Sequence, residues 1–166
     1  GAFNTSLEET EYLDRCRLKT ARLFEAACVL GRDSVGGEDS DVVALFGHRI
    51  GLAFQMLDDV LDIAGPVERT GKARGTDLLD GTVTLPFIEA AKVDPELRGY
   101  DLASLDETTA EALCDRISAT GALDTVRSRA MGLIEEAKAG LTGTAIEPGQ
   151  RKLLDLIADG VVLRYS

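Results

Sequence analysis

The stretch from residue 41 to residue 64 constrains the fold of this chain more than any other. Its apolar residues recur every three or four positions, which places them on one side of a helix at about 100° per residue. Ser40 or Asp41 can cap the start of this helix, and Gly65-Pro66 ends it. A long amphipathic helix must bury its apolar side against other elements. That side consists of Phe46, Ile50, Ala53, Phe54, Leu57 and Leu61.

The N-terminal part of the chain has the same helical period. We expect a first helix over residues 7–30, with Gly31 as its stop signal. At the other end of the chain, we expect Arg164, Tyr165 and Ser166 to fray; the alternative is that they close over the phosphate site. The buried stripe of the first helix should contain Tyr12, Cys16, Leu23, Phe24, Ala27 and Cys28.

Beyond residue 64 the pattern alternates between loops and helices, and strand-like alternation is almost absent. Residues 65–82 contain four glycines and several charges, which is typical of a structured surface loop. Thr84 and Pro86 suit the cap and first turn of a helix that begins near Val83. Further helices are expected over residues 106–120, 122–140 and 148–163. The sequence therefore predicts an all-α antiparallel helical bundle in a single domain, residues 1–166.

Composition excludes several classes of protein. The net charge of −11 argues against nucleic-acid binding, which needs clusters of Lys and Arg. No apolar run approaches the roughly 20 residues that cross a bilayer, so an integral membrane protein is not expected. Cys16, Cys28 and Cys114 have no CxxC spacing and are interpreted as reduced core thiols. These features, together with the lack of a secretory leader, predict a cytoplasmic protein.

The polar side of the helix over residues 41–64 carries the chemistry. Asp58, Asp59 and Asp62 share this side with Gln55, and residues three and four apart on a helix are neighbours. Like charges packed in this way repel, and a cation would relieve the repulsion. Mg²⁺ suits the site because it binds carboxylate oxygens and fills its other positions with water and phosphate. The alternative is a solvated acidic face, which normally includes alternating Lys or Arg that this face lacks.

Two further patterns are weak on their own. The segment from Gly71 to Asp77 combines glycines with Lys72 and Arg74, which can donate to phosphate oxygens. Lys19-Thr20 lies in the middle of the first helix, where a lysine is usually only solvated. His48 is interpreted as a packed or hydrogen-bonded side chain.

Taken together, four motifs between residues 18 and 86 resemble the C-terminal half of the trans-polyprenyl diphosphate synthases. Farnesyl and geranylgeranyl diphosphate synthases belong to that family. The order and spacing of the motifs make the match specific. They are Leu18-Lys19-Thr20-Ala21; Gly47-x-x-x-Gly51 followed by Phe54-Gln55-x-x-Asp58-Asp59-x-x-Asp62; Gly71-Lys72-x-x-Gly75-x-Asp77; and Gly81-x-x-Thr84-Leu85-Pro86.

The resemblance implies an isoprenoid synthase fold, in which an all-α bundle surrounds an apolar cavity. It further implies Asp-rich motifs on two facing helices, with Mg²⁺ ions that bridge them to the diphosphate of an allylic substrate. The substrate would then alkylate isopentenyl diphosphate to give a longer trans product. Asp58, Asp59 and Asp62 would form the second of these motifs, with Asp58 as the most direct metal ligand.

The resemblance also implies roles for residues outside the acidic motif. Lys19 and Lys72 would bind the allylic diphosphate, and Thr20 and Gln55 would turn oxygen dipoles towards the developing carbocation. Asp77 would orient the lysine loop or a metal-bound water. These roles make Lys19, Thr20 and Gln55 the expected catalytic residues.

Two departures from the family pattern shape our expectations. The first Asp-rich motif lies upstream of the matched region, and Thr82 stands where the family usually has a lysine. We therefore expect the C-terminal half of a prenyltransferase that is inactive alone, self-associates and needs an N-terminal half or a partner subunit. In the family, product length depends on residues near the first motif.

Two alternatives stay open. The first is a non-catalytic small subunit of a heteromeric prenyl diphosphate synthase. The second, part of a class I terpene cyclase, ranks lower, because cyclases usually vary the motif that here contains Asp58, Asp59 and Asp62.

Overall fold

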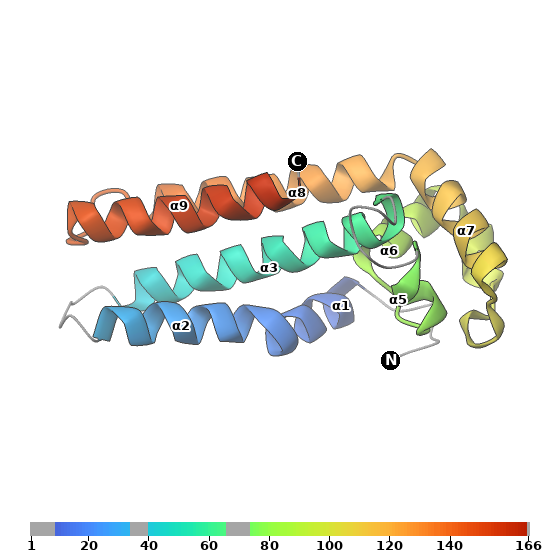
Figure 1. Ribbon diagram of the computed structural model, residues 1–166, viewed down its shortest axis with the longest axis horizontal. Coiled ribbons are helices and arrows are strands. Elements are labelled where there is room, and N and C mark those ends of the chain that lie inside the picture. Colours follow the sequence, from blue (N-terminus) through green and yellow to red (C-terminus); the bar gives the residue numbers. More distant parts are fainter. Residues whose placement is uncertain (1–8, 34–39, 66–73, 166) are drawn as a thin grey trace. The chain divides into compact units, whose positions relative to one another are not determined.

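The structure is a computed structural model that describes residues 9–33, 40–65 and 74–165 of the 166-residue chain. Regular structure in these ranges is entirely helical, which confirms the all-α class (Figure 1). The elements are α1 (Glu9–Cys16), η1 (Arg17–Ala21), α2 (Arg22–Asp33), α3 (Ser40–Ala64), α5 (Thr76–Leu79), α6 (Leu85–Val93), η2 (Pro95–Gly99), η3 (Leu102–Ser104), α7 (Glu107–Ala119), α8 (Ala122–Gly140) and α9 (Pro148–Arg164).

The chain divides into two compact units. The first contains the described parts of residues 1–13 and 56–128, and the second contains those of residues 14–55 and 129–166. Each unit is described by itself below. None of the helices in the described ranges is long and apolar enough to cross a membrane.

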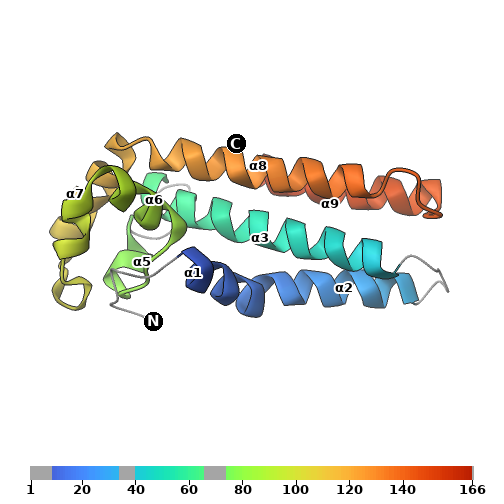
Figure 2. The ribbon, with the colours of Figure 1, turned by 180° about the vertical axis from the view of Figure 1, so that it is seen from behind.

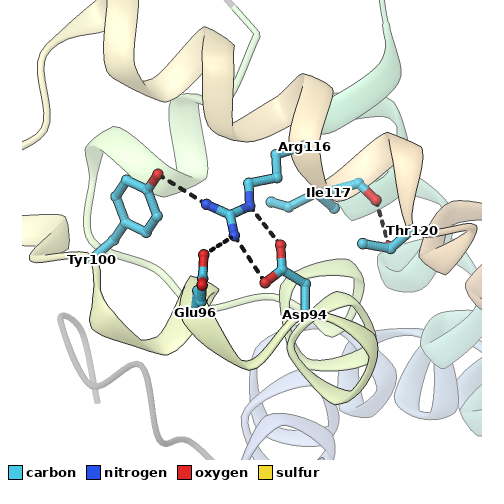
Figure 3. Close-up of polar contacts among 6 residues, drawn as sticks. All are labelled: Asp94, Glu96, Tyr100, Arg116, Ile117 and Thr120. Atoms are coloured by element: carbon cyan, nitrogen blue, oxygen red, sulfur yellow. Dashed lines mark hydrogen bonds and ion pairs between the residues drawn. The ribbon is translucent and has the colours of Figure 1, made fainter.

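The core of the first unit lies among the end of α3, the short helix α5, and helices α6 and α7. Arg116 of α7 fastens that helix to the turn that follows α6 (Figure 3). One of its terminal nitrogens donates to Asp94 Oδ1 at 2.9 Å and to Glu96 Oε2 at 2.8 Å, and the other donates to the Tyr100 hydroxyl at 3.3 Å. Fully buried members of the core are Ile63, Leu78, Leu85, Phe87, Leu97, Leu113 and Ile117.

In the second unit, α2 lies alongside the N-terminal part of α3, and α9 lies alongside α8 (Figures 1 and 2). Two glycines of α3 permit the first of these contacts. A Cβ atom at Gly47 would lie 2.7 Å from the Phe24 carbonyl oxygen, and one at Gly51 would lie 2.6 Å from Ala21 Cα. Any larger residue at either position would therefore force the two helices apart. This packing explains the spacing Gly47-x-x-x-Gly51.

The first helix differs from the prediction in its length and in its phase. It continues past Gly31 to Asp33, and η1 is a π-helical turn within it. Because a π turn contains one extra residue, the buried position that follows Cys16 is Ala21, five residues later. Phe24, three residues further on, is partly buried. The prediction that Leu23 and Ala27 are buried was wrong, since both are exposed and Leu23 retains 69% of its accessible surface.

The other helices lie close to their predicted positions. The predicted segments 106–120, 122–140 and 148–163 correspond to α7, α8 and α9. In the described part of the loop predicted over residues 65–82, Thr76–Leu79 form the short helix α5. Thr84 occupies the N-cap position of α6, but its buried hydroxyl makes no hydrogen bond there. The structure describes all three cysteines, and no disulfide joins them; Cys16 and Cys114 are buried, whereas Cys28 is partly exposed.

Candidate functional site

The three aspartates near the end of α3, all in the first unit, have three different environments. Asp58 is exposed, Asp62 is partly buried, and Asp59 retains 2% of its accessible surface. The Tyr12 hydroxyl, itself in the core, donates a hydrogen bond to Asp59 Oδ2 at 2.7 Å. The prediction that all three lie on one polar side is therefore wrong for Asp59, which a hydrogen bond from α1 holds in the interior.

Asp62 links α3 to the segment that follows the Gly71-Lys72 region. Its Oδ2 accepts the backbone N–H of Asp77 at 3.1 Å, and its carbonyl oxygen accepts the N–H of Gly75 at 2.9 Å. Burial raises the pKa of the Asp62 carboxyl to about 6, and the negative charges of Asp77 and Asp58 act in the same direction. The chain thus holds a carboxylate close to other carboxylates at a cost that a cation would relieve.

The donor set fits a cation that is not held by the protein alone. Among the described residues, no three His, Cys, Asp or Glu side chains are grouped closely enough to hold a metal ion. Asp58 and Asp62, one helical turn apart, offer carboxylate oxygens on neighbouring positions of α3. Mg²⁺ is commonly bound by one or two carboxylates, with water and substrate phosphate as its other ligands. The residues present fit that mode, and metal binding itself stays a prediction.

The predicted catalytic residues lie in the second unit. Lys19 and Thr20 are part of the π-helical turn η1, and Gln55 is on α3. The Thr20 hydroxyl donates to Gln55 Oε1 at 3.0 Å, so these two oxygens lie together, while Lys19 is exposed. π-helical turns occur often at functional sites because they redirect side chains that a regular helix would place elsewhere. This contact is compatible with the roles predicted for Thr20 and Gln55, and those roles stay predictions.

Comparison with known proteins decides the family. A model of the polyprenyl synthetase family matches residues 2–119. The chain belongs to the polyprenyl synthetase family.

Individual polyprenyl synthetases match across most of this chain. It is 39% identical over 160 residues to the geranylgeranyl diphosphate synthase of Methanosarcina mazei, with coverage of 94% of this chain and 48% of that protein. It is 37% identical over 150 residues to heptaprenyl diphosphate synthase component 2 of Geobacillus stearothermophilus, with coverage of 87% and 47%. The chain thus spans about half the length of the curated relatives that it matches.

Solved structures agree on the fold. The polyprenyl synthase of Caulobacter crescentus, complexed with calcium and isoprenyl diphosphate, superposes with a TM-score of 0.87 at 32% identity, over 99% of this chain and 52% of that one. The heptaprenyl diphosphate synthase of Staphylococcus aureus superposes with a TM-score of 0.90 at 23% identity, over 99% and 53%. The isoprenoid synthase fold, with about half of it present, is therefore confirmed.

The glycine-lysine motif is described only in part, because Gly71 and Lys72 lie outside the described residues. Arg74, which we predicted as a donor to phosphate oxygens, has acceptors within the protein, and its binding to phosphate stays a prediction. Its Nε donates to the Ile63 carbonyl oxygen at 2.9 Å, and its guanidinium pairs with Asp115 at 3.0 Å. These contacts use the side chain to attach the segment to α3 and α7.

Gly75 has a packing role. Its φ of 72° lies in the left-handed region, and a Cβ atom there would come within 2.8 Å of Cys114 Sγ. Burial raises the pKa of the Cys114 thiol to about 11, so the thiol stays protonated at neutral pH. The backbone approach that we predicted for a ligand at this glycine is made to α7.

Arg164 and Tyr165 pack in the second unit, contrary to the predicted fraying, whereas Ser166 lies outside the described residues. The Tyr165 ring meets the Phe54 ring edge to face at 5.8 Å, and the Arg164 guanidinium lies 5.1 Å from the Phe54 ring centre. Phe54 also contacts Phe24 of α2, with ring centres 5.6 Å apart. The position next to Gln55 is therefore held from two sides. His48 is partly buried, with its Nδ1 3.9 Å from Glu25 Oε2.

Sequence reasoning missed the contact of Tyr12 with Asp59 and the contacts of Arg74 with α3 and α7. Tyr12 was correctly placed in the core, but nothing in the sequence links it to Asp59, 47 residues later. Arg74 carries no signal that separates a ligand-binding arginine from a structural one, because its acceptors come from two other helices.

Proposed function

We propose that this chain contributes the second Asp-rich motif of a Mg²⁺-dependent trans-prenyltransferase, which condenses an allylic diphosphate with isopentenyl diphosphate. The observation that carries the proposal is the setting of Asp62. Burial of this carboxyl, together with the charges of nearby carboxylates, raises its pKa to about 6. Membership of the polyprenyl synthetase family supports it, as does the Caulobacter relative, which was crystallised with a divalent cation and an isoprenyl diphosphate.

In this proposal Asp58, Asp59 and Asp62 form the acidic motif, and Asp58 makes the most direct contact with the cation. Bound Mg²⁺ would supply positive charge that stabilises the departing diphosphate. Lys19 and Lys72 would bind diphosphate oxygens, because an ammonium is a compact donor that suits phosphate.

Thr20 and Gln55 would act on the other product of ionisation, the allylic cation. Their oxygens lie 3.0 Å apart and carry no full charge. Neutral dipoles of this kind stabilise a nearby cation without forming a bond to it, which would stop the reaction. The Thr20–Gln55 contact supports this assignment, because it fixes both oxygens in one place before substrate binds.

We further propose that a second half-bundle completes the enzyme. Two helices of the second unit present large apolar side chains to solvent, namely Leu18, Leu23 and Leu30 on η1 and α2, and Leu153, Leu156 and Leu163 on α9. Exposure on this scale is unusual for a folded unit and typical of a surface that another element covers. An N-terminal half or a partner subunit would cover it and supply the first Asp-rich motif. The expected cytoplasmic location stays a prediction.

The metal site is tested by calorimetric titration of the 166-residue chain. We expect Mg²⁺ together with a non-hydrolysable allylic diphosphate analogue to bind, and Asp58→Ala to weaken that binding at least about tenfold through loss of a charged ligand. Asp124→Ala is the matched control, since Asp124 is also an exposed helical acid of the first unit. Equal binding by the wild-type chain and Asp58→Ala would contradict the proposal.

A turnover assay separates the enzyme half from a non-catalytic subunit. The chain alone should release no diphosphate from an allylic diphosphate and isopentenyl diphosphate. Mixed with an N-terminal half that carries the first Asp-rich motif, it should do so, and Asp58→Ala should abolish that release. Release that is unaffected by Asp58→Ala would favour the non-catalytic subunit.

A further inference from the structure

The hydrogen bond between Tyr12 and Asp59 separates one aspartate of the acidic motif from the other two. Tyr12 retains 1% of its accessible surface and Asp59 retains 2%, and their oxygens are 2.7 Å apart. The bond joins α1 to α3 within the first unit. At this length it is typical of a hydroxyl that donates to an ionised carboxylate.

Burial makes this contact important for the position of α3. A carboxylate in the interior is costly unless donors compensate it, so Asp59 is favoured where the Tyr12 hydroxyl can reach it. The bond therefore restrains the rotation of the last turns of α3 about the helix axis.

That rotation decides where the other two aspartates lie. At about 100° per residue, Asp58 and Asp62 are about 40° apart around the helix, whereas Asp59 is about 60° from Asp62 and about 100° from Asp58 in the same sense. An inward Asp59 thus turns both of the others away from the core on one side. The observed exposure agrees, since Asp58 is exposed and Asp62 is partly buried.

We propose that Tyr12 is a positioning residue, which holds Asp59 in the core and so presents Asp58 and Asp62 to the divalent cation. Asp59 is then an anchor of the motif and makes no bond to the metal. This inference rests on the proposed function, because it concerns the same cation. It assigns different roles to aspartates that sequence spacing treats alike.

The test compares two tyrosine hydroxyls of the first unit. Tyr12→Phe removes the hydroxyl that reaches Asp59, and Tyr100→Phe removes one that accepts from Arg116, away from the acidic motif. In the Mg²⁺ and diphosphate-analogue titration, we expect Tyr12→Phe to weaken binding about tenfold, a loss that is usual when a group that orients the metal ligands is removed. Tyr100→Phe should bind as the wild type does.

The direction of the change distinguishes the possible roles. If the bond to Tyr12 kept Asp59 away from the cation, Tyr12→Phe would free Asp59 as an additional ligand and strengthen binding, which would overturn the inference. A role in stability alone would lower the urea midpoint of Tyr12→Phe but leave the affinity of its folded form unchanged, and this would also overturn it. If Asp58→Ala does not weaken binding, the proposed function fails instead.

A second pair of variants covers the case in which Tyr12→Phe does not fold. Asp59→Asn keeps an oxygen that accepts the Tyr12 hydroxyl, so the anchor survives, whereas Asp58→Asn removes a charged ligand. We expect Asp58→Asn to weaken binding much more than Asp59→Asn does. The reverse order would overturn the inference.

Discussion

At the scale of the residue, the end of α3 shows that environment decides what a carboxylate can do. Asp58, Asp59 and Asp62 are chemically identical and lie within five positions of one another. One meets solvent, one meets a buried hydroxyl, and one meets a backbone N–H and two other acids. Burial raises the pKa of the last, Asp62, and the charges of its neighbours act in the same direction.

The raised pKa of Asp62 predicts how stability varies with pH. The folded pKa of about 6 lies above the ordinary aspartate pKa of 3.8, so between these values the folded chain keeps a proton that the unfolded chain has lost. Stability should therefore be greatest below pH 4 for this group and fall as the pH rises through 6. For a carboxyl that is partly exposed to solvent, we expect a loss of about 1 kcal/mol.

Urea unfolding at pH 5.0 and pH 7.5 measures this difference. Asp62→Asn should remove the Asp62 contribution and be more stable than the wild type at pH 7.5. Mg²⁺ with the diphosphate analogue should offset the loss in the wild type, because the cation binds the ionised form. The same pH dependence in wild type and Asp62→Asn would assign the effect to another group.

The sequence predicts the identity of these aspartates but not their separate environments. Their spacing on a helix follows from local periodicity, which one helix determines. Asp59 lies inward in contact with Tyr12, and the pKa of Asp62 is raised by burial and then by the charge of Asp77. Contacts between residues so far apart in the chain leave no mark in local pattern.

At the scale of the element, η1 and α3 approach each other closely in the second unit. The π-helical turn places Ala21 against Gly51, and the same turn places Thr20 next to Gln55. The close approach of the two backbones therefore also sets the distance between the proposed catalytic oxygens.

Gly51→Ala tests this contact. The new Cβ would lie 2.6 Å from Ala21 Cα, and since the obstacle is backbone it cannot move aside cheaply. We expect a loss of about 2–3 kcal/mol in the free energy of unfolding. Urea unfolding followed by circular dichroism measures it.

Gly132→Ala is the matched control for this substitution. Gly132 is a helical glycine of the same unit, and a Cβ there would have nothing within 4 Å. It should stabilise the chain by about 0.5–1 kcal/mol, because alanine has the higher helix propensity. If Gly51→Ala and Gly132→Ala unfold at the same urea concentration, the close approach at Gly51 does not contribute to the free energy of unfolding.

Helix positions were well predicted from the sequence, and the π turn was not. Glycine, proline and capping residues mark helix ends locally, so α7, α8 and α9 are close to their predicted bounds. The π turn has no such marker, because it exchanges one backbone hydrogen-bond pattern for another over residues that also suit a regular helix. The incorrect prediction that Leu23 is buried follows directly, because it assumed a regular helix without a π turn.

At the scale of the whole molecule, the chain is about half as long as its relatives and exposes apolar side chains on α2 and α9. Next to them is a cavity of about 420 Å³ in the second unit, lined mainly by apolar residues of α2 and α9. Motif order predicted the family and the half-length match. Which surface meets another chain could not be predicted, because that depends on the helices that cover it.

We predict that the isolated chain self-associates at micromolar concentrations through these apolar side chains. Leu156→Glu should reduce association, since it places a charge on an exposed apolar position of α9. Ser128→Glu, which adds the same charge at an exposed polar position, is the control. Sedimentation velocity over a range of concentrations measures the effect, and a wild-type chain that stays monomeric throughout would contradict it.

The contact between Gly75 and Cys114 gives the chain a built-in chemical reporter. An alkylating reagent needs both access and a thiolate, and the buried, protonated thiol of Cys114 offers neither while residue 75 covers it. The rate at which Cys114 is alkylated therefore reports how frequently the backbone at residue 75, near Asp77, separates from α7. The labelling rate of Cys114, measured with and without a diphosphate analogue, would report the rate of a movement that equilibrium binding does not reveal.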